Sequence, residues 1–297
     1  MATSFTFIGF GEAAQHISRG LKASGAGPIR SYDVLFNAPA GQRLRDRAAE
    51  IGVTVCASHR EAVAGSDVVV AAVTASSALD AARSAAPGLA SGQFYVDINS
   101  ISPAMKAQVQ AAVSSPGARF VEVAVMESVP PHGHKVPMLL AGPDAAALVP
   151  VLQAFGMRVE AVGERVGQAS SVKLLRSILI KGLESLMLES LYVASNLGVA
   201  DRVLASMAET YPSMDWPKTA DYLIGRTALH GARRESEMRE AARMLRDVGF
   251  EPVMAEAIAN RIGWCAATLR GHKWSGLPAA EDVFAALNER VPHRPTA

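Results

Sequence analysis

Short apolar runs alternate with Ala-rich amphipathic segments through the first 162 residues of the chain. The apolar runs predict strands at 5–8, 29–32, 53–55, 68–73, 94–97, 120–125 and 136–141. The segments between them predict helices, among them 13–24, 40–51, 77–86 and 103–113. Strands that alternate with helices of this length are typical of βαβ units, so residues 1–162 predict a doubly wound α/β domain with a parallel sheet.

The pattern changes after Gly163. Residues 164–197 contain no proline, and their apolar residues recur at helical spacing, as at Val172, Leu175, Leu179, Leu183, Leu186 and Leu191. The remainder to residue 288 also has a helical pattern, with a turn at 211–217. We therefore predict a second, all-α domain over 163–297 that begins with a long interdomain helix.

The first predicted strand runs into the stretch "TFIGFGEAAQ" at 6–15, which has the spacing Gly-x-Gly-x-x-Ala. In a dinucleotide-binding turn the first glycine makes the tight turn, the second lets the diphosphate approach, and a third small residue lets the helix pack closely. Gly9, Gly11 and Ala14 fit these roles, and Phe10, Glu12 and Ala13 complete the expected cofactor-binding turn. The spacing alone also fits a strand that ends in flexible residues.

Asp33 follows the second predicted strand, 22 positions after Gly11. An acidic side chain there accepts hydrogen bonds from the adenosine ribose, so the combination predicts a Rossmann-type domain that binds NAD. Arg43, Arg45 and Arg47 leave NADP open, because arginines in this region can hold a 2′-phosphate. Their alternative interpretation is a solvated helix face.

Composition and charge exclude several other classes. The 29 Lys and Arg residues nearly balance the 28 Asp and Glu residues, so we expect no nucleic-acid or membrane partner. Cys56 and Cys265 are isolated, and His132 and His134 lack a third ligand, so we expect no metal and no structural disulfide. The expected protein is cytoplasmic.

Three motifs in this order resemble the β-hydroxyacid dehydrogenase superfamily, which includes 3-hydroxyisobutyrate and 6-phosphogluconate dehydrogenases. "FIGFGEAAQ" is similar to the cofactor motif of that family, "VDINSISP" at 96–103 to its D-x-S-T-x-x-P segment, and "GERVGQASSVKLLRS" at 163–177 to its G-x-G-x-x-x-K-x-x-x-N helix. The C-terminal third is more similar to a divergent branch of 6-phosphogluconate-dehydrogenase-like proteins.

The resemblance implies an NAD(P)-dependent dehydrogenase that acts on a hydroxy acid or related alcohol. Lys173 takes the place of the catalytic lysine, the general base that accepts the hydroxyl proton. Val73, Thr74 and Asn99 would contact the nicotinamide, and Ser100 the substrate, in a cleft between the domains. The resemblance also implies a homodimer joined through the C-terminal domain, consistent with the many apolar positions of the long helix.

The chain departs from the family at three places. Ser177 replaces the substrate-binding asparagine, and Met126-Glu127-Ser128 replaces a Ser-Gly-Gly carboxylate cradle, so Glu127 either points away or meets a cationic or polyhydroxylated substrate. Glu127 and Ser128 stay in the expected pocket. Ser236-Glu237 replaces a Lys-Asp pair, and at helical spacing Arg226, His230 and Arg233 share one face that can supply the missing charge, with Arg234 beside them. A solvated basic face is the alternative.

Two other functions remain open. An imine reductase or reductive aminase on the same fold is favoured by Glu127, whereas Lys173 counts against it. A non-catalytic NAD(P)-binding protein would bind cofactor without turnover and without dependence on Lys173.

Overall fold

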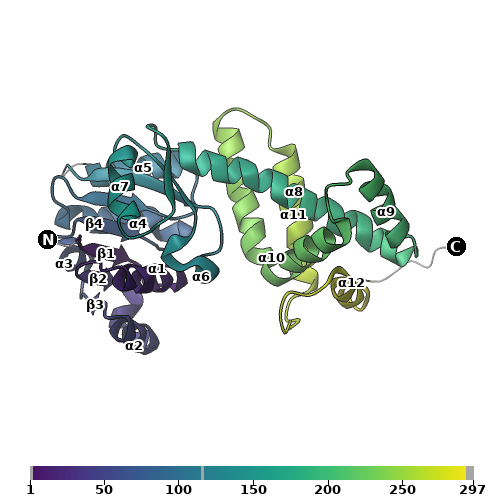
Figure 1. Ribbon diagram of the computed structural model, residues 1–297, viewed down its shortest axis with the longest axis horizontal. Coiled ribbons are helices and arrows are strands. Elements are labelled where there is room, and N and C mark those ends of the chain that lie inside the picture. The colour runs from purple at the N-terminus through teal and green to yellow at the C-terminus, as the bar shows by residue number, and fades with distance from the viewer. Residues whose placement is uncertain (1–2, 115–116, 292–297) are drawn as a thin grey trace. The chain divides into compact units, whose positions relative to one another are not determined.

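The computed structural model describes residues 3–114 and 117–291. The chain divides into two compact units, Met1–Lys173 and Leu174–Ala297. Helix α8, Gln168–Asn196, carries the chain from the first unit into the second (Figure 1).

An eight-stranded, mostly parallel sheet forms the centre of the first unit. Its strands are β1 Phe5–Ile8, β2 Ile29–Tyr32, β3 Thr54–Val55, β4 Val68–Ala71, β5 Phe94–Asp97, β6 Arg119–Val125, β7 Met138–Ala141 and β8 Val159–Gly163. They lie in the order β3-β2-β1-β4-β5-β6-β7-β8, and Phe5 of β1 is in register with Ile29 of β2 and Val68 of β4. The strand order reverses direction between β1 and β4, which is where ligands bind in open α/β sheets.

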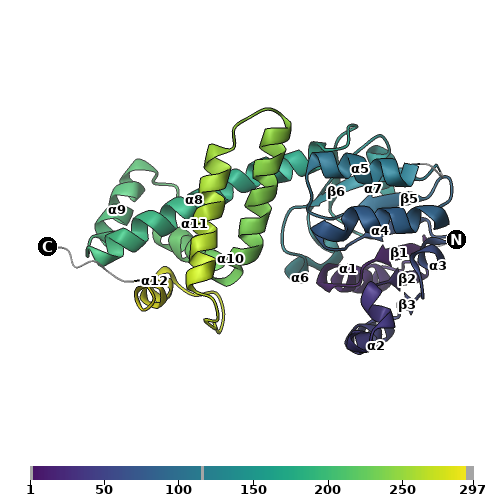
Figure 2. The ribbon, with the colours of Figure 1, turned by 180° about the vertical axis from the view of Figure 1, so that it is seen from behind.

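Helices cover both faces of this sheet (Figure 2). The helices of the first unit are α1 Glu12–Ala23, α2 Gln42–Ile51, α3 His59–Val63, α4 Ala78–Ala85, α5 Pro103–Ser114, α6 Val129–His132 and α7 Ala145–Gln153. Leu21 of α1 and Leu148 of α7 pack on one face, while Ala82 of α4 and Val109 of α5 pack on the other. Because both faces are covered, every residue of β1 and β4 is buried and all but Thr6 are apolar, and the predicted doubly wound Rossmann-type fold is confirmed.

The second unit is helical, as predicted. It contains most of α8 together with α9 Ala200–Thr210, α10 Trp216–Asp247, α11 Val253–Thr268 and α12 Ala280–Asn288. Leu188 of α8, Ile224 of α10 and Phe284 of α12 share one hydrophobic core. The Asp215 carboxylate caps α10 by accepting from the backbone N–H of Lys218 at 3.1 Å, which explains why the predicted turn ends there.

The structure corrects three details of the sequence prediction. Strand β8 was not predicted, because this edge strand buries Val159 but exposes Glu160 and lacks a continuous apolar run. Strand β7 is antiparallel to β6, so the sheet is not wholly parallel. The long helix begins at Gln168 and not at 164, because Gly167 has φ +102, outside the helical region.

Candidate active site

The Gly-rich turn after β1 has the conformation that a dinucleotide site requires. Gly9 has φ +88, and an added Cβ there would lie 2.5 Å from the Ala72 carbonyl oxygen and 2.9 Å from Val73 Cγ1. Only glycine fits this position, which brings the end of β1 against the segment after β4. Gly11, the N-cap of α1, has no heavy atom within 4 Å of an added Cβ and no side-chain cap, so there is free space beside the N-terminus of the helix, the end that favours an anion.

The other predicted residues of the turn occupy distinct positions. Phe10 and Ala14 are buried in the core, whereas Glu12 and Ala13 form the first turn of α1 and Glu12 is exposed. Asp33 lies beside this turn, where its carboxylate accepts from the backbone N–H of Phe10 at 2.8 Å. Asp33 therefore also holds the turn in place, a role that the sequence pattern did not reveal.

The arginines that left NADP open are partly engaged by their own neighbours. The Arg45 guanidinium donates to the backbone oxygens of Phe36 and Ala38. Arg47 pairs with Glu50 at 2.6 Å. Arg43 is exposed.

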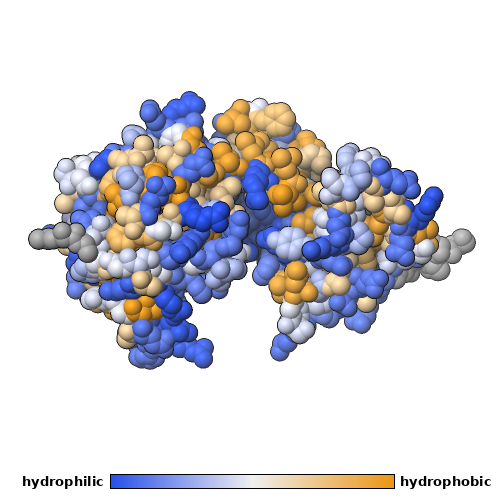
Figure 3. Space-filling view, viewed as in Figure 1, coloured by the Kyte–Doolittle hydropathy of each residue, from blue (hydrophilic) through white to orange (hydrophobic). Residues whose placement is uncertain are grey.

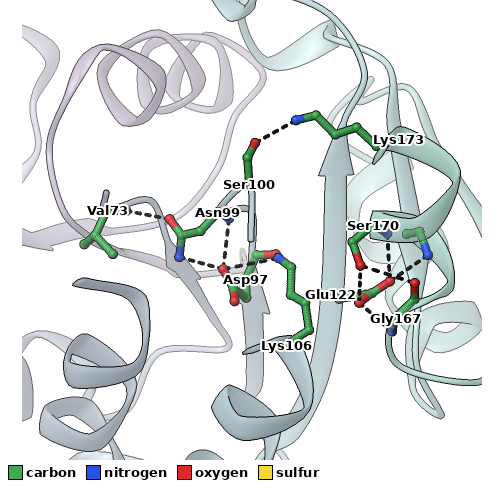
Figure 4. Close-up of polar contacts among 10 residues, drawn as sticks. Val73, Asp97, Asn99, Ser100, Lys106, Glu122, Gly167, Ser170 and Lys173 are labelled. Atoms are coloured by element: carbon green, nitrogen blue, oxygen red, sulfur yellow. Dashed lines mark hydrogen bonds and ion pairs between the residues drawn. The ribbon is translucent and has the colours of Figure 1, made fainter. Parts of the chain in front are cut away.

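Asn99 links the ends of β4 and β5. Its Oδ1 accepts from the backbone N–H of Val73 at 2.8 Å, and its Nδ2 donates to Asp97 Oδ1 at 2.6 Å (Figure 4). Thr74, which follows Val73 in the chain, has an exposed hydroxyl 2.9 Å from the hydroxyl of Ser77. The structure thus brings Val73 and Asn99 together, and their contact with a nicotinamide stays a prediction.

Lys173 reaches the same turn from the first part of α8. Its Nζ donates to Ser100 Oγ at 2.8 Å, and the lysine is half-buried (Figure 4). The Ala72 N–H donates to the Ile8 carbonyl oxygen at 2.8 Å, which brings the segment after β4 beside the Gly-rich turn. Val73 is bonded to Asn99, and Ser100, the next residue, is bonded to Lys173, all within the first unit.

A buried carboxylate anchors the start of α8. Glu122 of β6 is completely buried and accepts from the backbone N–H groups of Gly167 at 2.7 Å, Ala169 at 2.6 Å and Ser170 at 3.1 Å (Figure 4). A carboxylate at a helix N-terminus satisfies N–H groups that have no partner within the helix. Sequence reasoning missed Glu122, whose only signal is a lone acidic residue inside the apolar run "FVEVAV".

The residues that depart from the family are also placed. Glu127 is half-exposed, and its carboxylate lies 2.8 Å from His132 Nε2. Ser128 is the N-cap of α6, and Ser177 lies one helical turn after Lys173, half-buried. Glu127 thus has a partner of its own, and the substrate roles of all three stay predictions.

In the second unit, α10 is kinked at His230, which has φ −126 and ψ 18. The kink interrupts the regular helical spacing from which we expected a single basic face. Burial lowers the pKa of His230, and the nearby charges of Arg233, Arg226 and Arg234 lower it further, against the effect of Glu237. Arg226 donates to the Tyr222 hydroxyl at 2.8 Å and Arg234 to Glu184, so these two cations have partners of their own, and the substrate role of His230 stays a prediction.

Shortly after this kink in α10, two ion pairs join α8 to α10. Lys181 lies 2.9 Å from Glu237, and Arg234 Nε donates to Glu184 at 3.0 Å; Lys181, Glu184 and Arg234 are buried. Burial lowers the pKa of Lys181, while the Glu237 charge raises it. The interface between α8 and α10 therefore contains buried ion pairs in addition to apolar side chains.

His134 and the two cysteines lie in the protein interior. His134 is buried and lies 3.1 Å from both Ser24 Oγ and the Phe155 carbonyl oxygen, and both cysteines are buried free thiols. Within residues 3–114 and 117–291, no group of three His, Cys, Asp or Glu side chains could hold a metal ion. None of the described helices has both the length and the apolar content needed to cross a membrane.

Two family models match the chain. The model described as "NADP oxidoreductase coenzyme F420-dependent" matches residues 4–100, and "Domain of unknown function (DUF1932)" matches residues 194–264. A curated relative, the mitochondrial 3-hydroxyisobutyrate dehydrogenase of Drosophila melanogaster, is 24% identical over 220 residues, 72% of this chain and 65% of that protein.

Solved structures show stronger similarity. A conserved hypothetical protein from Sinorhizobium meliloti 1021 is 41% identical, with a TM-score of 0.84 over 98% of this chain and 97% of that chain. A conserved protein of unknown function, described as structurally similar to 3-hydroxyacid dehydrogenases, is 30% identical, with a TM-score of 0.77 over 96% of this chain and 99% of that chain.

The fold and the Gly-rich turn define a Rossmann-type α/β protein with a helical C-terminal unit. The chain belongs to the β-hydroxyacid dehydrogenase superfamily, so the resemblance seen in its motifs is confirmed.

Proposed function

We propose that the protein is an NAD(P)-dependent oxidoreductase that transfers a hydride between a nicotinamide cofactor and a hydroxy acid or related alcohol. The observation that carries this proposal is the series of hydrogen bonds that joins the end of β1 to the segment after β4, Val73 to Asn99, and Ser100 to Lys173. This series supports a site in which a diphosphate-binding turn and an amine act together, and superfamily membership supports the same chemistry.

The residues present fit a dinucleotide. The N-terminus of α1 at Gly11 would hold the diphosphate, Asp33 the adenosine ribose, and Val73, Thr74 and Asn99 the nicotinamide. The cofactor supplies the hydride acceptor or donor when bound. We propose NAD as the preferred form, because the Asp33 carboxylate would repel a 2′-phosphate.

Lys173 supplies the proton transfer in this proposal. During alcohol oxidation its neutral Nζ accepts the hydroxyl proton, and in the reverse direction the ammonium returns a proton to the carbonyl oxygen. The hydrogen bond to Ser100 Oγ restricts where the amine points, which fits a positioned general base. An imine substrate is less well supported, because the Glu127 carboxylate that favoured it lies against His132.

The experiment that tests the function has two stages. Titration of the protein with NADH and NADPH measures cofactor affinity, and we expect binding with NADH preferred. Formation of reduced cofactor is then measured with a panel of 3-hydroxy acids and sugar acids. Consumption of reduced cofactor is measured with a parallel panel in which ketones are paired with amines. Cofactor binding without turnover on either panel would favour the non-catalytic alternative, and turnover on the amine panel alone would favour an imine reductase.

A Gly11→Asp variant is expected to lose cofactor affinity without losing stability. Gly11 has φ −70 and ψ −170, which any residue adopts, and aspartate is a favourable N-cap. Its carboxylate would occupy the diphosphate position, so we expect the Kd for NADH to rise about 100-fold through charge repulsion. Calorimetric titration measures the change. The neutral control Gly11→Ser should stay within about tenfold of wild type, and equal Kd values for wild type and Gly11→Asp would refute the assigned turn.

We also propose a homodimer formed through the second unit. Leu175, Leu179, Leu186 and Val193 are exposed on α8, with Leu179 at 76% and Leu186 at 62%, and seven-residue spacing places the last three on one stripe. A further group of exposed apolar residues lies where α10 ends and α11 begins: Val248, Phe250, Val253 and Met254. Figure 3 shows hydrophobic side chains gathered over both regions. In a two-fold symmetric dimer, these two surfaces of one copy would be covered by the same two surfaces of the other copy.

A Leu179→Arg/Leu186→Arg variant is therefore expected to be monomeric at micromolar concentration, because two charges would enter the centre of the contact. Light scattering measures the mass. Leu277→Arg, a substitution on the exposed loop before α12, should leave the dimer intact. A wild-type protein with the mass of one chain would contradict the proposal.

A further inference from the structure

Lys106 is a charged residue for which the proposed chemistry has no direct use. It lies on α5 and is only 1% exposed, among the most buried side chains of the first unit. Its Nζ donates to the Asp97 carbonyl oxygen at 2.7 Å and lies 3.4 Å from Asp97 Oδ1 (Figure 4). A lysine is rarely buried so completely unless it is paired, and here the pair lies directly behind the turn that carries Asn99 and Ser100.

The partner of Lys106 organises this turn. Asp97 is fully buried at the end of β5, and its Oδ1 accepts from the Asn99 backbone N–H at 2.9 Å and from Asn99 Nδ2 at 2.6 Å. The two bonds orient the Asn99 amide so that its Oδ1 faces the Val73 N–H. Asp97 Oδ2 is buried and has no hydrogen-bond partner among the described residues. Both hydrogen bonds from Asn99 therefore go to the same oxygen of the Asp97 carboxylate, Oδ1.

From these contacts we infer that Lys106 and Asp97 are positioning residues for the nicotinamide end of the cofactor site. The Lys106 ammonium compensates the buried Asp97 charge and holds Oδ1 in place, Oδ1 fixes the Asn99 amide, and Asn99 ties together the two loops after β4 and β5. Lys106 itself is too buried to contact a ligand. The inference rests on the proposed function, because it assigns the Asn99 turn to the nicotinamide.

A Lys106→Met variant tests the inference, since methionine keeps a similar unbranched stem and removes the charge. A carboxylate left buried without its cation will move or recruit new partners and so release Asn99. We expect the Kd for NADH to rise about tenfold, equivalent to roughly 1.4 kcal/mol. The Kd for ADP-ribose, which lacks the nicotinamide, should stay within about twofold, because its contacts lie at the Gly-rich turn.

Two further variants separate a positioning role from a general loss of stability. The double variant Lys106→Met/Asp97→Asn contains no buried unpaired charge, and its amide oxygen can still accept from Asn99, so NADH affinity should recover most of the loss. Val113→Ala removes buried side-chain volume from the same helix without touching the pair and should change neither Kd at a temperature where the protein is folded.

The outcomes distinguish this inference from the proposed function. An unchanged NADH affinity in Lys106→Met, equal losses of NADH and ADP-ribose affinity, or a double variant as weak as the single one would overturn the inference alone. A wild-type protein that binds neither NADH nor NADPH would overturn the proposed function and this inference with it. If Lys106→Met does not fold, the double variant decides: near-wild-type affinity supports the inference, and weak NADH binding overturns it.

Discussion

Replacement of Lys173 by alanine is expected to lower turnover by about 10³-fold, within the range that general acid–base catalysis contributes. The variant loses the only proton-transferring group that we assign to the reaction, while the Gly-rich turn and the Asn99 contacts remain. The Kd for NADH should therefore change by less than about threefold. Steady-state rates with the best substrate of the panel and a calorimetric titration measure the two effects separately.

Two controls sharpen the Lys173 experiment. Lys135→Ala removes an exposed lysine from the same unit and should leave the rate unchanged. Small primary amines added to the Lys173→Ala variant should restore part of the rate, because they can occupy the space of the missing side chain and accept the proton. Turnover above a tenth of the wild-type rate in Lys173→Ala would show that another group moves the proton, and the assigned mechanism would be wrong.

Substitution of Glu122 by alanine is expected to have the largest effect on stability. Three backbone N–H groups at the start of α8 would lose their acceptor inside the protein. We expect the free energy of unfolding to fall by about 3–4 kcal/mol, since each buried donor left without a partner costs about 1–3 kcal/mol and the helix end can partly relax. Urea unfolding followed by circular dichroism measures the loss.

The same substitution links stability to catalysis. Lys173 lies in the first two turns of α8, so a displaced helix start should also lower turnover in the fraction that stays folded. Glu122→Gln keeps one acceptor oxygen but directs an amide N–H toward the helix N–H groups, and its stability should lie between those of alanine and wild type. Glu160→Ala, an exposed substitution on β8, should change stability by less than about 0.5 kcal/mol. A loss below about 1 kcal/mol in Glu122→Ala would contradict the anchoring role.

Local pattern was enough to select residues that the structure brings close together. Gly9 could be assigned from spacing because a tight turn with φ +88 against the Ala72 carbonyl excludes every side chain. Asn99 and Lys173 could be assigned because they stand in short motifs whose order matches the superfamily. The kink at His230 was not predicted, because its local signal is the single Gly231 that follows it, and helices commonly tolerate an isolated glycine.

The sequence by itself determined the α/β and all-α halves and the Gly-rich turn, because these follow from periodicity and from spacing within a few residues. The superfamily came from the resemblance of three short motifs to those of known relatives. Only the tertiary structure decided that Glu122 anchors α8, that Asp33 holds the Phe10 backbone, and that Lys106 lies buried against Asp97. In each of these contacts the charged group and its partner belong to different elements or loops of the fold. The partner of a buried charge depends on which strand ends and helix starts the fold brings together, and no local pattern records that choice.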